Sequence, residues 1–312
     1  MAVELSRPRD SEAVLGSLRA LLAGVVDYAG LFPPATLDMP QTVRNYADDL
    51  RGPDGWMLGR LIVPAGRLDE FEQHAEGLLP TETDAEPWHL SALVGAADDP
   101  QLATDIQRVC AFNDTHAVAA RGLATIRVLE LRAASADAIE AALNLMPDEL
   151  FPFFELSAEQ DPRGLMAALA GSDAGAKVRT GGIEPGAVPK PEHLARFIAT
   201  CTAAGLPFKA TAGLHHPLRH DSPALGVKEF GFLNVFVAAV LADKAGLGAP
   251  DLSAILAEES ADAFAFHDDE LRYRDHAVPT DQVAETRGKL AISFGSCSFA
   301  EPREDLRSMK LL

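Results

Sequence analysis

The chain has 312 residues, of which 47 % are hydrophobic and 23 % are charged, a composition typical of a globular protein with a sizeable core. Forty-six acidic against twenty-seven basic residues give a formal net charge of -19, which disfavours binding to nucleic acid or to an anionic membrane surface. The sequence has no apolar run of about eighteen residues and no export signal at its start, so no membrane span is expected. The three cysteines are far apart and lack CxxC spacing, which indicates a reducing, cytoplasmic location.

A helix is predicted from Glu12 to Ala23, and short apolar runs then alternate with longer Ala/Leu-rich amphipathic runs. The apolar runs predict strands at Gly24–Asp27, Met57–Val63, His89–Val94, Ala124–Leu131, Leu150–Leu156, Ala176–Arg179, Phe208–Thr211, and an eighth at either Phe264–Phe266 or Leu290–Phe294. Helices are predicted between them at Pro40–Leu50, Leu68–Leu79, Pro100–Phe112, Ser135–Leu145, Pro162–Ala170, Pro191–Ala204 and Phe230–Ala245.

This alternation predicts an α/β protein with a closed (β/α)8 barrel of the TIM type. An open doubly wound sheet is the alternative, but no GxGxxG follows the first strand. We expect one domain over residues 1–312, with residues 250–286 as an inserted helix and hairpin that decorates the barrel or contacts a second subunit in a homo-oligomer.

Ionisable residues occur within or just after the predicted strands, although barrel strands are buried on both faces. They are Asp27, Arg60, Glu130, Glu155, Lys177, Arg179 and Lys209. The alternative for Glu130, Glu155 and Arg60 is that they are partners in a buried ion-pair network or lie in water at strand ends. Because the carboxyl ends of barrel strands converge on one mouth, the set predicts an active site there.

Lys177 and Arg179 lie two residues apart and so share a face of their strand, and Lys209 and Thr211 repeat this spacing on the next strand. We therefore expect the two lysines to be neighbours. A second cation and burial both lower the pKa of a lysine, and a neutral lysine attacks a carbonyl carbon to form a Schiff base. The carboxylates predicted to move protons in this chemistry are Asp27, Glu130 and Glu155.

Glycine-rich segments follow three of the later strands, and their backbone N–H groups are candidates to bind an anionic substrate. A plain turn is the alternative for each glycine. The predicted substrate-binding residues are Arg60, Arg179, Thr180, Gly181, Gly182, Thr211, Gly213, His215, His216, Gly295, Ser296 and Ser298.

The segment Ala176-Lys177-Val178-Arg179-Thr180-Gly181-Gly182 resembles the Schiff-base lysine strand of deoxyribose-phosphate aldolase and related class I aldolase barrels. The segments Phe208-Lys209-Ala210-Thr211-Ala212-Gly213-Leu214 and Phe294-Gly295-Ser296-Cys297-Ser298 are similar to that family's next strand and to its phosphate loop. The resemblance implies that Lys177 is the nucleophile, that Lys209 tunes it, and that the glycine-rich segments bind phosphate. The overall pattern also resembles bacterial barrel proteins with no assigned function.

Two other functions are compatible with the same residues. His215 and His216 follow a strand, and with Glu155 they could hold a divalent metal in a metal-dependent hydrolase or lyase. A non-enzymatic barrel that binds a small anion is the other alternative. The favoured prediction is an aldolase or lyase that forms a Schiff base without a metal cofactor, on a small phosphorylated or carboxylated carbonyl compound.

Three further features have alternative interpretations. The acidic run from His267 to Glu270 is either a solvated hairpin or a cation site. The DYAGLFPPA segment that begins at Asp27 either lines the mouth of the barrel or closes its bottom. Cys297 is a possible nucleophile, but no serine-hydrolase-type elbow and no histidine at a known spacing supports it.

Overall fold

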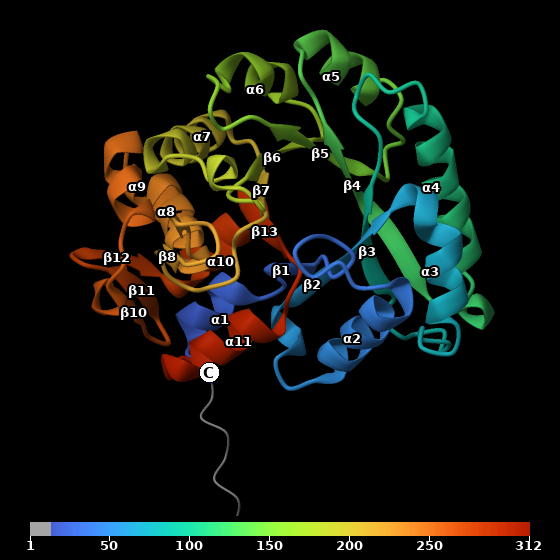
Figure 1. Cartoon of the computed structure of the whole chain (residues 1–312), viewed down its shortest axis with the longest axis horizontal. Helices are drawn as coiled ribbons and strands as arrows, with labels where there is room; N and C mark the ends of the chain where they lie inside the picture. Colours follow the sequence, from blue (N-terminus) through green and yellow to red (C-terminus); the bar gives the residue numbers. More distant parts are fainter. Residues whose placement is uncertain (1–13) are drawn as a thin grey trace, which may run out of the picture.

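The computed structural model describes residues 14–312, in which eight parallel strands close into a barrel, as predicted (Figure 1). The order around the barrel is β1, β13, β7, β6, β5, β4, β3 and β2, which pairs again with β1. The barrel strands are β1 (Val26–Tyr28), β2 (Leu58–Pro64), β3 (Trp88–Leu93), β4 (Ala124–Arg132), β5 (Phe151–Leu156), β6 (Gly175–Arg179), β7 (Phe208–Thr211) and β13 (Ala291–Ser296).

Helices alternate with these strands and surround the barrel (Figure 1). They are α1 (Gly16–Leu22), α2 (Met39–Arg51), α3 (Leu68–Ala75), α4 (Leu102–His116), α5 (Ala136–Leu143), α6 (Arg163–Leu169), α7 (Pro191–Ala204), α8 (Phe232–Ala245), α9 (Ala249–Leu256), α10 (Thr280–Lys289) and α11 (Ala300–Ser308). The predicted start of the first helix at Glu12 lies outside the described residues.

Local sequence signals account for several helix ends. The Asp38 side chain accepts a hydrogen bond from the N–H of Gln41 at the start of α2, and Ser135 does the same for Ala138 at the start of α5. Gly205 and Gly246 end α7 and α8 in the left-handed conformation, with φ of 60° and 67°, which costs glycine little.

The eighth barrel strand is β13, so of the two predicted candidates the segment around Leu290–Phe294 is correct. The other candidate, β10 (Phe264–Phe266), belongs to a separate antiparallel sheet with β11 (Glu270–Tyr273) and β12 (His276–Pro279). A turn of only three residues separates β10 from β11, and so short a connection favours pairing between sequence neighbours. The predicted hairpin is therefore part of this small sheet.

The inserted segment explains why α8 is apolar on every side. All residues from Phe232 to Val240 are fully buried, because α8 packs between the barrel and a second layer formed by α9, α10 and β12. Within α8, the Asn234 side chain donates to the carbonyls of Ile255 and Glu258, both at 2.8 Å, and accepts from the N–H of Arg219 at 2.9 Å. One buried amide thus joins α8 to the end of α9 and to the loop that precedes α8.

The acidic run from His267 to Glu270 forms hydrogen bonds with the first turn of α1. Asp268 accepts a hydrogen bond from the N–H of Gly16 at 3.0 Å, and the backbone carbonyl of His267 accepts one from Ser17 at 2.9 Å. These bonds satisfy N–H groups that the first turn of a helix leaves free. The run is therefore a turn that holds α1.

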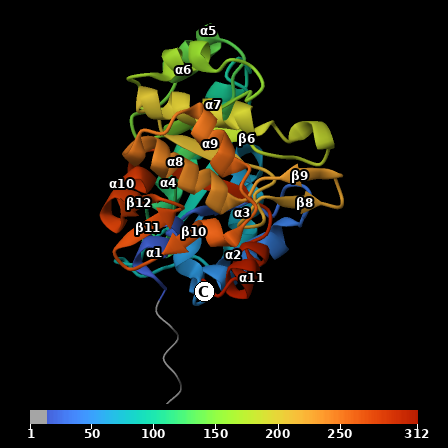
Figure 2. The ribbon, with the colours of Figure 1, turned by 90° about the vertical axis from the view of Figure 1, so that its left-hand side faces the viewer.

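The two ends of the barrel differ (Figure 2). The hairpin of β8 (His220–Ser222) and β9 (Val227–Glu229) follows β7 and projects on one side, whereas α1 and the sheet β10–β12 lie on the other. The DYAGLFPPA segment follows the carboxyl end of β1 and therefore lies at the mouth, not at the bottom. Among residues 14–312, no helix combines the length and apolar character needed to cross a bilayer.

Candidate active site

Glu130 lies at the centre of a buried network of charged side chains inside the barrel. Its Oε2 lies 2.8 Å from Nζ of Lys177, and its Oε1 lies 2.5 Å from Nζ of Lys209. Lys177 also lies 3.1 Å from Oε2 of Glu155, and Lys209 lies 2.6 Å from Oδ2 of Asp27. Negative and positive charges therefore alternate without a break from Glu155 to Asp27.

An arginine lies at each end of this network. Arg179 is 3.8 Å from Glu155, and Arg60 is 3.7 Å from Asp27, to which the backbone N–H of Arg60 also donates at 2.8 Å. The arginine side chains are 52 % and 29 % exposed, whereas those of the two lysines are at most 6 % exposed. The network thus runs through the barrel interior and reaches water at its two ends.

Two serines complete the network. The hydroxyl of Ser91 donates to Oε1 of Glu130 at 2.7 Å, and the hydroxyl of Ser293 donates to Oδ2 of Asp27 at 2.6 Å. With them, each of the eight barrel strands contributes a polar side chain. Sequence reasoning missed both serines, although each is a polar residue inside an apolar strand segment.

The strand register explains this convergence. Lys177 is the direct partner of Glu155 on β5 and of Lys209 on β7, and Lys209 is in turn the partner of Ser293 on β13. Adjacent strands lie about 4.8 Å apart, so side chains of register partners on the same face are within ion-pair reach. The two lysines are therefore neighbours that share Glu130.

The pKa of Lys177 is shifted in the direction opposite to the one predicted from the sequence. Burial alone would lower the pKa of Lys177, but Glu130 and Glu155 outweigh it and raise the pKa above its ordinary value. Burial likewise would raise the pKa of Glu130, but Lys177 and Lys209 hold it well below its usual range. The predicted lowering of the Lys177 pKa was wrong, because the sequence did not reveal that carboxylates would separate the two lysines.

Glycines leave space for the network. A Cβ atom at Gly59 would lie 2.6 Å from Oδ1 of Asp27, and one at Gly295 would lie 3.1 Å from Oγ1 of Thr211. Both distances are too short for an unstrained contact. Gly295 thus keeps the interior open beside Thr211, which lies two residues beyond Lys209 on β7.

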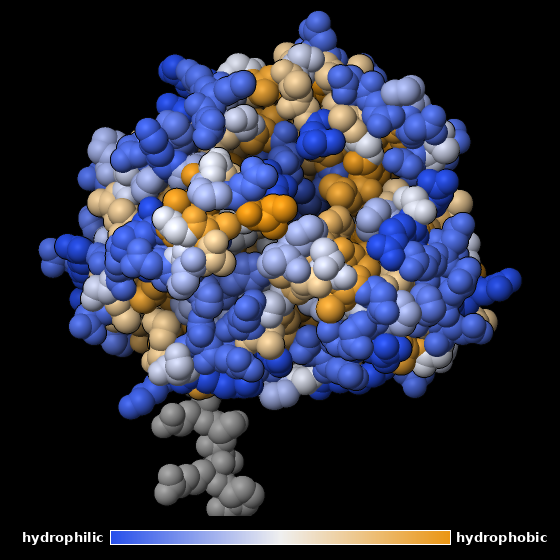
Figure 3. Space-filling model, viewed as in Figure 1, coloured by the Kyte–Doolittle hydropathy of each residue, from blue (hydrophilic) through white to orange (hydrophobic). Residues whose placement is uncertain are grey.

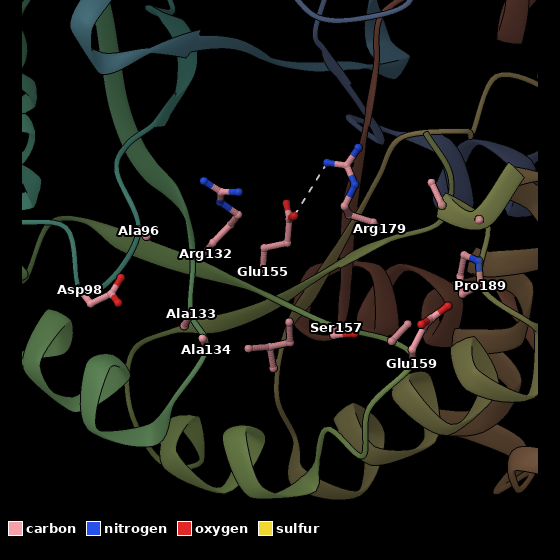
Figure 4. Close-up of a pocket in the computed structure, with 14 residues that line it drawn as sticks. Ala96, Asp98, Arg132, Ala133, Ala134, Glu155, Ser157, Glu159, Arg179 and Pro189 are labelled. Carbon is pink, nitrogen blue, oxygen red and sulfur yellow. Dashed lines mark ion pairs between the residues drawn. The ribbon is translucent and has the colours of Figure 1, made fainter. Parts of the chain in front are cut away.

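A pocket of about 510 Å³ opens where Glu155 reaches the mouth of the barrel (Figure 4). Its lining comes from the ends of β4, β5 and β6 and from the loops that follow β3, β4, β5 and β6. Arg132 and Arg179 lie on either side of Glu155 in the close-up, and within the described chain Arg132 forms no ion pair. The space-filling view of this side is hollowed near its middle (Figure 3).

The pocket is lined by Ala96, Asp98, Arg132, Ala133, Ala134, Glu155, Leu156, Ser157, Ala158, Glu159, Arg179, Gly186, Ala187 and Pro189. Sequence reasoning missed Arg132, although it lies two residues after Glu130 and thus on the same face of β4. Its exposed guanidinium adds a positive charge to the rim.

In the glycine-rich segments, the hydroxyl groups of Thr180 and Ser296 donate to backbone carbonyls within these segments. Thr180 donates to the carbonyl of Ala212 at 2.5 Å, and Ser296 donates to the carbonyl of Ser298 at 2.7 Å. The backbones of Gly181 and Gly213 pack directly against each other, where a Cβ at either position would lie less than 3 Å from the other glycine. Gly182 packs similarly against Ala187. Anion binding by these loops stays a prediction.

His215 and His216 contact α11 instead of Glu155. Nδ1 of His215 lies 2.8 Å from Glu301, and Nδ1 of His216 lies 2.5 Å from Asp305. In the part of the chain that the structure describes, no three His, Cys, Asp or Glu side chains are grouped so that they could hold a metal ion. The geometry therefore does not favour the metal site that the sequence left open.

In comparisons with known proteins, no family model, no curated protein and no solved structure matches the chain.

Proposed function

We propose that the protein is an aldolase-type lyase in which Lys177 forms a Schiff base with a small anionic carbonyl compound. The observation that carries the proposal is the position of Lys177, which contacts Glu130 inside the barrel and Glu155 at the edge of the pocket. Charged groups at the carboxyl ends of barrel strands are the usual location of catalytic residues in this fold.

Lys177 must lose a proton before it can attack a carbonyl carbon, because its two carboxylate neighbours favour the ammonium form. Glu155 is the acceptor in this proposal, since it lies 3.1 Å from Nζ and its side chain is 13 % exposed at the pocket. The nitrogen lone pair then forms the C–N bond, and the carbonyl oxygen takes up the proton that Glu155 returns. A second proton passes from the nitrogen to the same oxygen, and loss of water leaves the iminium ion.

Lys209 assists without reacting. Its side chain is 1 % exposed, and its ammonium group is held between Glu130 and Asp27. The positive charge of Lys209 partly neutralises the carboxylate of Glu130 that both lysines share. Glu130 therefore stabilises the ammonium form of Lys177 less strongly. Lys209 is therefore a positioning and electrostatic residue.

Arg132 and Arg179 are the residues that would bind a negatively charged group of the substrate. Both guanidinium groups lie at the pocket, and arginine pairs well with planar carboxylate or phosphate groups. The pocket volume of about 510 Å³ is within the range of small-molecule sites. A phosphorylated or carboxylated carbonyl compound fits these features.

A second candidate is a non-covalent enzyme that moves a proton next to a carbonyl group. The raised pKa of Lys177, caused by Glu130 and Glu155 against the opposing effect of burial, favours this chemistry because it keeps the ammonium charged. The ammonium would donate a hydrogen bond to the enolate oxygen while Glu155 removes the proton from carbon. Binding of a small anion without reaction is the remaining alternative.

Borohydride trapping tests the proposal. The protein is incubated with small aldehydes, ketones and keto acids and reduced, and the added mass is located by peptide mass spectrometry. We expect a stoichiometric adduct on Lys177 that disappears in Lys177→Arg and persists in Lys289→Arg, an exposed control. Trapping should become faster as the pH rises, because the fraction of neutral amine rises.

The other outcomes separate the candidates. No adduct, but exchange of substrate hydrogen with deuterated water that Glu155→Gln abolishes, would establish the non-covalent enzyme. Neither adduct nor exchange, with thermal stabilisation by one of the tested anions, would make the protein a binding protein. Thermal unfolding of each variant verifies that it is folded.

A further inference from the structure

Cys297, His215 and Glu301 form a second cluster of reactive side chains at the mouth. Sγ of Cys297 lies 3.8 Å from Nε2 of His215, and Nδ1 of the same ring lies 2.8 Å from Oε2 of Glu301. Cys297 follows β13 and His215 follows β7, and because these strands are neighbours their loops meet. None of the three residues contacts the lysine network through a hydrogen bond or ion pair.

The cluster has the order of a nucleophile, a base and a group that orients the base. Burial alone would lower the pKa of His215, but Cys297 and Glu301 raise it to about 9. The ring is therefore expected to carry a positive charge near neutral pH, and a neighbouring imidazolium favours the thiolate form of a cysteine. The side chains of His215 and Glu301 are 18 % and 50 % exposed, whereas Cys297 is buried, so solvent reaches the cluster from the side of Glu301.

Two nearby backbone N–H groups are already engaged. The N–H of Ser298 donates to Oγ of Ser296 at 3.3 Å, and the N–H of Glu301 donates to Oγ of Ser298 at 3.2 Å. Acyl transfer needs free donors that face the oxyanion of its tetrahedral intermediate. These two N–H groups are therefore not free to serve as such donors, whereas direct attack of sulfur on an electrophilic carbon does not need them.

We propose that Cys297 is a nucleophilic thiolate site for small conjugated carbonyl compounds, with His215 as its counter-ion and proton donor and Glu301 as the residue that positions His215. Sγ supplies the electron pair for the new S–C bond at the β carbon, and the π electrons of the C=C bond move toward the carbonyl oxygen. The proton on Nε2 of His215 then passes to the α carbon, which leaves a neutral imidazole and a saturated thioether. No oxidant or further reactant is needed.

N-Ethylmaleimide, a conjugated carbonyl compound, is the probe. The intact chain is treated with limiting reagent at about pH 6, where an ordinary thiol is almost entirely protonated, and the labelling rate of each cysteine is measured by peptide mass spectrometry. Cys110 is the internal reference, because burial, Glu149 and Asp114 all raise the pKa of its thiol. Cys110 is only partly buried and Cys201 is fully buried, so Cys201 reports whether the chain stays folded.

We expect Cys297 to be labelled about tenfold faster than Cys110, although Cys297 is the less exposed of the two. His215→Gln should lower the rate at Cys297 by about tenfold and leave the rate at Cys110 unchanged. Glu301→Gln should also lower the rate at Cys297, because the ring of His215 then loses the carboxylate that orients it. His216→Gln is the matched control, because the adjacent His216 pairs with Asp305 and not with the thiol.

Labelling of Cys297 at or below the rate of Cys110 in the wild-type chain would overturn the proposal, whatever the variants do. An unchanged Cys297 rate in a folded His215→Gln chain would also overturn it. Neither outcome bears on the lysine network, which is tested by reduction of a Schiff base.

Discussion

At the scale of single residues, Glu130 decides whether two lysines can be buried side by side. Its two carboxylate oxygens each accept one ammonium group, and the Ser91 hydroxyl satisfies a further lone pair. Removing a charge from water costs several kcal/mol unless partners of good geometry replace the water. Each lysine keeps a second carboxylate, Glu155 or Asp27, but only Glu130 contacts both.

Glu130→Gln should therefore lower the free energy of unfolding by about 3–5 kcal/mol, because the neutral amide leaves two buried ammonium groups with one carboxylate each. Urea unfolding at neutral pH measures the loss. Glu140→Gln, on the exposed side of α5, is the control and should change the free energy by less than about 0.5 kcal/mol. Equal effects of the two substitutions would show that the network contributes little to stability.

At the scale of elements, the inserted α9 and the sheet β10–β12 turn α8 from a surface helix into a buried one. A surface helix needs a polar face, whereas α8 has apolar residues on all sides and buries Asn234 among them. The three hydrogen bonds of Asn234 satisfy the carbonyls of Ile255 and Glu258 and the N–H of Arg219. The attachment of the insertion to the barrel thus depends on a buried polar contact as well as on apolar packing.

Asn234→Ala should lower the free energy of unfolding by about 3 kcal/mol, since it leaves buried backbone groups without partners. Urea unfolding provides the measurement. Asn144→Ala is the matched control at the exposed end of α5, where no side-chain hydrogen bond of Asn144 occurs within the described chain. If Asn234→Ala cost no more than Asn144→Ala, water would be replacing the lost bonds.

At the scale of the whole molecule, the ion network joins all eight strands of the barrel, so its titration affects the stability of the barrel as a unit. The pKa of Glu130 is lower in the folded chain than its ordinary value of 4.5, because Lys177 and Lys209 outweigh the effect of burial. Its contribution to stability is therefore complete above that value and is lost as the pH falls toward the folded pKa. Lys177 has a raised pKa, so its contribution is complete below 10.5 and is lost as the pH rises through the folded pKa.

The difference in unfolding free energy between the wild-type chain and Glu130→Gln should consequently be constant from about pH 5 upward through neutrality and should shrink at lower pH. A series of urea titrations between about pH 3 and pH 8 measures it. The Glu140→Gln difference should stay near zero at every pH. A Glu130→Gln difference that is independent of pH down to pH 3 would contradict the assigned direction of the Glu130 shift.

Part of the site could be predicted because alternate residues of a strand point to the same face, and this spacing can be read from the sequence. Lys177 with Arg179, and Lys209 with Thr211, were placed on shared faces by spacing alone, and the register confirms that the two lysines are neighbours. The raised pKa of Lys177 could not be predicted in this way. It depends on Glu130, a carboxylate that enters from β4, two strands away from β6 around the barrel.

The sequence by itself determined the closed barrel and most of its strands, because alternating apolar runs and helix caps are local signals. Only the tertiary structure decided which segment is the eighth strand, since Phe264–Phe266 and Leu290–Phe294 are both short, mainly apolar runs that could each form a strand. They are told apart by what pairs with them. The tertiary structure also decided that His215 meets Cys297, residues 82 positions apart. Contacts of this kind follow from closure of the barrel, which brings the loops after β7 and β13 together, and no local pattern encodes that distance.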